Sequence, residues 1–151
     1  MDVLIVYEGQ RGSTQRIAEA LQQAVALHRH AGTLAVLEDT TPEAVAAADA
    51  MLVGCWSEGD EPFGGEATQH LVDWIEALPD LAGKPIGLYC AASGFPHPFS
   101  QSGDTTDSTI AALSQGVADR NGVVAATHAF NRFGLDPEAA AFVEAVFAAA
   151  V

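Results

Sequence analysis

The residues with the clearest chemical potential lie near the N-terminus, where an apolar run ends in a short loop and a helix begins. The apolar run is Val3–Tyr7, the loop carries Gly9 and Gly12, and Ser13 and Thr14 open an amphipathic segment. A helix that starts directly after a strand and a loop presents free backbone N–H groups and the positive end of its dipole to one small volume. A phosphate group suits that volume best.

This loop carries neither of the two common nucleotide-binding motifs. Its glycines are three positions apart and no lysine follows, so it is not a Walker A loop, and it is not Gly-x-Gly-x-x-Gly. What remains is a nest for one phosphate, made of the N–H groups from Gln10 to Thr14 and the Ser13 and Thr14 hydroxyls. Arg11 can add a charge-assisted contact. An ordinary strand-to-helix turn capped by a serine is the alternative interpretation.

Five apolar runs alternate with helical patterns along the chain and must position this loop. The expected strands are 3–7, 33–37, 50–55, 85–91 and 123–130, and the expected helices cover about 13–29, 42–48, 66–78, 104–120 and the segment after 136. Gly32 is expected to end the first helix. The strands lack polar alternation, which is typical of a parallel sheet buried on both faces. We therefore predict one α/β domain over residues 1–151, a three-layer, doubly wound sheet with right-handed crossovers.

Ligands of such sheets bind beyond the carboxyl ends of the strands. Three expected loops lie there, 8–12, 56–65 and 92–103, and they hold glycines and aromatic residues that the strands and helices do not explain. The acidic residues of the second loop lack the spacing of a calcium-binding loop, so they are interpreted as a solvated rim and no metal site is predicted. No nucleophile elbow or Ser-His-Asp order is present, and no catalytic residue is assigned.

The amino-acid composition limits the classes of partner that this chain is expected to bind. The net charge is −14, from 20 acidic and 6 basic residues, which argues against nucleic acid and anionic membranes and suits basic partner surfaces, or simply solubility. No apolar run is long enough to cross a membrane and no signal peptide is visible, so a cytoplasmic location is expected. The two cysteines, Cys55 and Cys90, are too few for a disulfide framework and are expected to be buried thiols, with a redox role left open.

The segment from Tyr7 to Ala18 resembles the phosphate-binding loop of the flavodoxin family, whose pattern is Ser/Thr-x-Thr-Gly-x-Thr. Gly12 and Thr14 match the last Gly and Thr of that pattern, whereas Gly9 stands where a hydroxyl residue is expected and Arg11 replaces a Thr. The resemblance spans the whole chain and includes the short-chain character, because strand five lacks the long-chain insertion. It implies a flavodoxin-like sheet with strand order 2-1-3-4-5.

The resemblance also implies FMN as the cofactor. Its phosphate would lie on the first loop, and its ring edge would lie against the backbone of the second and third loops. Trp56 and Phe95 are the candidates for the two walls of the ring, and His97 is either a proton donor or a filler of its loop. The expected cofactor-binding residues are Gly9, Gln10, Arg11, Gly12, Ser13, Thr14, Cys55, Trp56, Ser57, Glu58, Ala91, Ala92, Ser93, Gly94, Phe95 and His97.

The function implied first is that of an electron carrier, a monomer or weak dimer that passes electrons from a partner reductase to an acceptor through basic docking surfaces of its partners. An FMN-dependent quinone reductase or quinone-linked oxidase is the second candidate, favoured by Arg11 and by the long loop that carries His97. A flavodoxin-fold interaction module that no longer binds flavin is the third, favoured by the altered phosphate motif.

Overall fold

The computed structural model describes residues 1–8, 12–56, 66–91, 102–130 and 135–150. For residues 12, 13, 56, 66–68 and 102–108 it describes the backbone and no side chain. Within these ranges no helix is both long enough and apolar enough to span a membrane.

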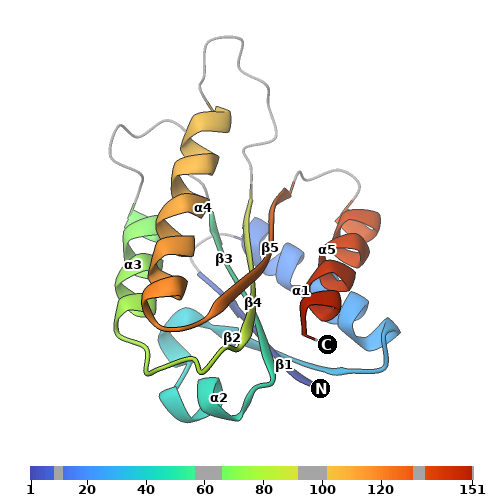
Figure 1. Ribbon diagram of the computed structural model, residues 1–151. Coiled ribbons are helices and arrows are strands. Elements are labelled where there is room, and N and C mark those ends of the chain that lie inside the picture. The colour runs from blue at the N-terminus through green and yellow to red at the C-terminus, as the bar shows by residue number, and fades with distance from the viewer. Residues whose placement is uncertain (9–11, 57–65, 92–101, 131–134, 151) are drawn as a thin grey trace.

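One parallel sheet of five strands forms the middle layer, in the order β2-β1-β3-β4-β5. The strands are β1 (Asp2–Tyr7), β2 (Ala31–Val36), β3 (Ala50–Trp56), β4 (Pro85–Ala91) and β5 (Val123–Phe130). Every strand pair is parallel, so all five carboxyl ends lie at the same edge of the sheet (Figure 1). The predicted fold and strand order are confirmed.

Helices cover both faces of the sheet. The helices α1 (Gly12–Leu27) and α5 (Leu135–Ala149) pack together on one face, and α3 (Glu66–Glu76) and α4 (Ser102–Asp119) pack together on the other (Figure 1). A 3₁₀ turn (Leu37–Asp39) and α2 (Pro42–Ala47) connect β2 to β3. The inner strands β1, β3 and β4 therefore bury side chains on both sides, which explains why their sequences show no polar alternation, whereas the edge strands β2 and β5 stay partly exposed.

The core divides into two halves according to the alternation of side chains along the strands. On the α1/α5 side lie Val3 and Ile5 of β1 together with Tyr89 of β4. On the α3/α4 side lie Leu4 and Val6 of β1, again with partners from β3 and β4. The side of the sheet on which any later residue lies follows from this alternation.

The end of α1 differs from the prediction. Arg29, with a φ of 62°, takes the left-handed position after the helix, and the N–H of His30 bonds to the carbonyl of Val25 at 3.2 Å. Gly32 lies inside β2 instead, where a Cβ atom would come within 3.3 Å of Val25 and 3.4 Å of Ile5. This glycine serves the close approach of α1 to the sheet, so its assignment as the helix stop is wrong.

Candidate functional site

Two buried polar side chains at the carboxyl edge of the sheet lack hydrogen-bond partners within the described part of the chain. Glu8 directly follows β1 and is 2% exposed, and Thr14 lies in the first turn of α1 and is 0% exposed. Both carboxylate oxygens of Glu8 and the Thr14 hydroxyl oxygen find no partner among the described residues. Because a buried polar atom without a partner destabilises the folded protein, such atoms mark a place where a ligand can supply the missing bonds.

Thr14 belongs to the positive end of a long helix. The 16-residue α1 has no acidic residue in its first turn, so nothing within that turn offsets the positive end of the dipole. The backbone N–H groups of that turn have no carbonyl partner inside the helix, and Thr14 adds a hydroxyl donor beside them. The described part of the predicted phosphate nest therefore fits an anion.

Glu8 faces the other side of β1. Its N–H donates to the carbonyl of Gly54 at 3.2 Å, which continues the β1–β3 register by one step beyond the Tyr7–Gly54 pair. This step sets Glu8 beside Cys55. In the alternation along β1, Glu8 follows Leu4 and Val6, which belong to the core on the α3/α4 side.

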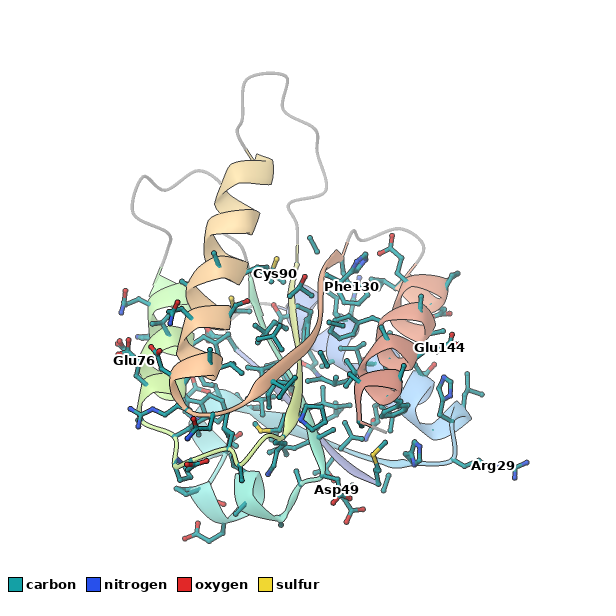
Figure 2. The ribbon with its side chains drawn as sticks, in the orientation of Figure 1. Arg29, Asp49, Glu76, Cys90, Phe130 and Glu144 are labelled. Atoms are coloured by element: carbon teal, nitrogen blue, oxygen red, sulfur yellow. The ribbon has the colours of Figure 1, made fainter. Side chains whose placement is uncertain are left out.

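A row of three buried residues thus crosses the end of the sheet on that side. Cys55 of β3 and Cys90 of β4 are register partners, and both are 0% exposed. Glu8, directly after β1, continues the row next to Cys55. Cys90 is labelled near the carboxyl end of β4 in Figure 2. The expectation that the cysteines are buried at the same end of neighbouring strands is confirmed.

Tyr89 supports this edge from the α1/α5 side. Its hydroxyl donates to the carbonyl of Val6 at 3.2 Å, and its ring lies over Gly54, where a Cβ atom would be only 2.2 Å from the ring. Burial raises the pKa of Tyr89 far above its usual range, and the nearby Cys55 and Tyr7 raise it further. Tyr89 is therefore a neutral hydrogen-bond donor that ties β4 to β1.

The structure describes only part of the predicted site. Gly12, Ser13 and Thr14 lie in the first turn of α1, and Cys55, Trp56 and Ala91 lie at the paired ends of β3 and β4. For Gly12, Ser13 and Trp56 this placement concerns the backbone. The remaining predicted residues lie outside the described residues: Gly9, Gln10, Arg11, Ser57, Glu58, Ala92, Ser93, Gly94, Phe95 and His97.

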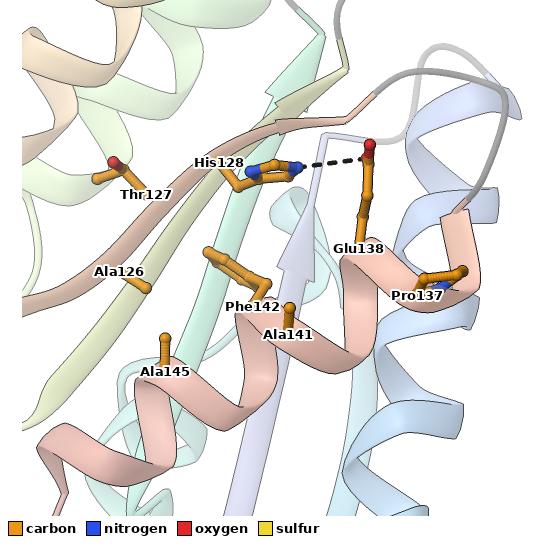
Figure 3. Close-up of a pocket in the computed structure, with 8 residues that line it drawn as sticks. All are labelled: Ala126, Thr127, His128, Pro137, Glu138, Ala141, Phe142 and Ala145. Carbon is orange, nitrogen blue, oxygen red and sulfur yellow. Dashed lines mark hydrogen bonds and ion pairs between the residues drawn. The ribbon is translucent and has the colours of Figure 1, made fainter.

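A hollow lies between β5 and α5, away from Glu8 and Thr14. Its volume is about 410 Å³, and it is lined by Ala126, Thr127, His128, Pro137, Glu138, Ala141, Phe142 and Ala145 (Figure 3). His128 Nε2 lies 3.3 Å from Glu138 Oε2, and the His128 ring packs edge-on against Phe130 at 4.6 Å. Because its polar groups already pair with each other, this groove is a weaker candidate for a ligand site.

Comparison with known proteins supports the fold. No protein-family model matches the sequence, and no curated protein matches it significantly. A short-chain flavodoxin associated with a non-canonical PDU bacterial microcompartment superposes with a TM-score of 0.79 at 17% identity, covering 100% of this chain and 99% of that one. The chain has the flavodoxin fold.

Two further flavodoxin structures agree. Oxidised flavodoxin 2 from Bacillus cereus matches with a TM-score of 0.74 at 16% identity over 98% of this chain and 99% of its own. Two-electron reduced flavodoxin from Megasphaera elsdenii matches with a TM-score of 0.70 at 24% identity, over 95% and 97% of the two chains. At these identities the likeness concerns the fold.

Glu8 is the site residue that the sequence interpretation missed. Its signal was present in the sequence, because an acidic residue directly follows the apolar run of β1. The sequence does not show that this side chain is buried, since a residue just after a strand is ordinarily solvated. Its burial, and the lack of a partner for its carboxylate among the described residues, emerge only in the folded sheet, where its N–H pairs with β3.

Proposed function

We propose that this chain binds FMN non-covalently and carries electrons between a partner reductase and an acceptor. The observation that supports this most directly is the buried Thr14 hydroxyl at the start of α1, which has no partner among the described residues, in a chain with the flavodoxin fold. A phosphate monoester brings the acceptor oxygens that this hydroxyl and the neighbouring N–H groups require.

The phosphate would be held by the first loop and the first turn of α1, through Gly9, Gln10, Arg11, Gly12, Ser13 and Thr14. The ring edge would lie on the backbone of Cys55, Trp56, Ser57 and Glu58 and of Ala91, Ala92, Ser93, Gly94 and Phe95, with His97 nearby. Trp56 and Phe95 would exclude water from the two ring faces. When bound, FMN supplies one- and two-electron transfer, so the protein needs no acid–base group of its own.

The acidic composition fits this role. With a net charge of −14, the chain attracts partners that carry basic docking surfaces, and that attraction weakens with added salt. We propose a cytoplasmic protein that works as a monomer or weak dimer.

The test is a titration of the purified chain with FMN, followed by flavin absorbance and fluorescence. We expect saturable binding and a change in flavin emission. If neither signal responds at millimolar FMN, the proposal is wrong and the fold serves an interaction module. If the FMN-loaded chain reduces a quinone with NAD(P)H and no added reductase, the electron-carrier role gives way to that of a quinone reductase.

The phosphate assignment has its own test in Arg11→Ala. If Arg11 contacts the phosphate, the substitution weakens FMN binding about tenfold, a loss typical of a charge-assisted hydrogen bond, and leaves riboflavin binding unchanged. Equal weakening of the two flavins would show that Arg11 acts on the fold or on the ring.

A further inference from the structure

Glu8 presents a problem that an anion-binding site does not solve. Its carboxylate is buried beside the start of the predicted phosphate site, and neither oxygen has a partner among the described residues. A carboxylate oxygen accepts hydrogen bonds, and a phosphate brings acceptor oxygens of its own instead of donors. The group that satisfies Glu8 must therefore be a different part of the ligand, and it must carry hydrogen-bond donors.

The positions of the two unpartnered side chains suggest how the ligand is arranged. Thr14 lies on α1, which covers one face of the sheet. Glu8 comes two residues after Val6, which faces the other side, and its N–H donates to the carbonyl of Gly54, so the strand alternation directs its side chain to that other side. A molecule that reaches both must cross the carboxyl end of β1. Beyond Glu8 in the same direction come Cys55 and Trp56, where β3 ends.

The order across the sheet is thus an anion site at Thr14, an acceptor site at Glu8, and the end of β3. FMN has a matching order, because a chain of three hydroxyls separates its phosphate from its ring. Vicinal hydroxyls are donors that a carboxylate can accept in pairs, through bonds stronger than those between neutral groups.

We propose that Glu8 is a specificity-determining residue that accepts hydrogen bonds from the hydroxyl-bearing chain of the ligand, while Thr14 holds its phosphate. This inference rests on the proposed FMN function and assigns a role to a residue that lies outside the predicted phosphate contacts. It also accounts for a buried carboxylate that has no partner among the described residues, since the hydroxyl chain would supply the missing donors.

The test compares three flavins that differ by one part each. Lumiflavin has the ring alone, riboflavin adds the hydroxyl chain, and FMN adds the phosphate. The ratio of lumiflavin to riboflavin dissociation constants measures the contribution of the hydroxyl chain, and the ratio of riboflavin to FMN measures that of the phosphate. Each is determined by fluorescence titration of the same protein.

Glu8→Gln is expected to reduce the hydroxyl-chain ratio about tenfold and to leave lumiflavin binding unchanged, because hydrogen bonds to a charged group are worth about that factor. Thr14→Val, of nearly the same shape, is expected to reduce the phosphate ratio and to leave the hydroxyl-chain ratio unchanged. Asp49→Asn is the matched control, because its carboxylate lies at the far end of the sheet and already accepts the N–H of Asp2 at 2.8 Å.

An unchanged hydroxyl-chain ratio in Glu8→Gln overturns the inference, and so does an equal loss for all three flavins, which would place Glu8 in the fold or against the ring. A second probe separates this outcome from failure of the proposed function. Ribitol 5-phosphate should raise the melting temperature of the wild-type chain more than inorganic phosphate does, and this difference should vanish in Glu8→Gln. If no flavin binds but this difference is present, the FMN function fails while the role of Glu8 stands; if both are absent, both fail.

Discussion

At the amino end of the sheet, polar groups pair with each other. The N–H of Asp2 donates to Asp49 Oδ2 at 2.8 Å, and the N–H of Asp49 donates to the carbonyl of Asp2 at 2.8 Å. Asp80 accepts the N–H of Ala82 and the side-chain amide of Asn121, each at 2.7 Å. These two bonds, the backbone one first, lower the pKa of the Asp80 carboxyl.

At the carboxyl end, Glu8 and Thr14 are more deeply buried than these groups and yet lack such partners among the described residues. Glu8 nevertheless pairs with β3 through its N–H. Among the described residues, the polar groups at the amino end are satisfied by the protein itself, whereas these side-chain groups at the carboxyl end are not. Mutants at the two ends can measure what this difference contributes to stability.

The largest effect is expected from Gly54→Ala, beneath the site. The new Cβ atom would lie 2.2 Å from the Tyr89 ring, so the free energy of unfolding should fall by at least ~3 kcal/mol in urea denaturation. Gly83→Ala at the amino end is the comparison. Gly83 has a φ of 78° with no atom within 4 Å of the added Cβ, and only backbone strain of about 1 kcal/mol opposes it. Similar losses in the two mutants would contradict the packing argument.

Glu8→Leu should stabilise the protein without ligand. Removing a buried carboxylate that has no partner is expected to raise the free energy of unfolding by about 2 kcal/mol. At the other end, Asp49→Ala removes an acceptor in use and should lower it by about 0.5 kcal/mol. Changes in the free energy of unfolding that have opposite signs in the two mutants would support the contrast between the two ends of the sheet. A loss of stability in Glu8→Leu would mean that the carboxylate already has a partner.

The raised pKa of Tyr89 predicts that the protein loses stability at alkaline pH. Because this pKa is raised in the folded protein, the neutral phenol contributes its full stabilisation of the fold below pH ~10, where ~10 is the pKa of an exposed tyrosine. That stabilisation is lost as the pH rises above this value. The expected slope is about 1.4 kcal/mol per pH unit. Tyr89→Phe should reduce this slope between pH 9 and 11, although it costs stability at neutral pH because the bond to Val6 is lost. Urea denaturation at several pH values measures both; equal slopes would rule out Tyr89 as the cause.

The last comparison, with the smallest expected effect, is between two threonine hydroxyls. Thr41 caps α2 by accepting the N–H of Ala44 at 3.2 Å, so Thr41→Ala should lower the free energy of unfolding by about 1 kcal/mol. Thr14→Val should lower it by less or raise it, because the Thr14 hydroxyl has no partner to lose among the described residues. Thermal melts of the two variants side by side decide this; a larger loss in Thr14→Val would show that its hydroxyl is in use.

Much of the fold could be predicted from local pattern. The strands Pro85–Ala91 and Val123–Phe130 have the predicted bounds. The first is a continuous apolar run, which specifies a strand buried on both faces, whereas the second is a partly exposed edge strand delimited by the turn residues before it. The sequence also predicts that α4 ends at Asn121-Gly122, and in the structure Asn121 takes a left-handed φ of 59° just after that helix. Gly32 was misread because a glycine near a helix end usually signals a left-handed turn, whereas here Arg29 takes that position and the glycine admits a neighbouring helix.

The candidate site likewise has one part that follows from local sequence and another that depends on the tertiary structure. The sequence by itself determined the alternation of strands and helices, the glycine-bearing loop before α1 and the hydroxyl of Thr14, because these depend on residues close together in the chain. Only the tertiary structure decided that Cys55 and Cys90 are register partners, and that Glu8 is buried with no partner for its carboxylate among the described residues. Register and burial depend on which distant strands come to lie side by side. The sequence of β1 does not specify its pairing with β3, because that pairing is set only when the sheet forms.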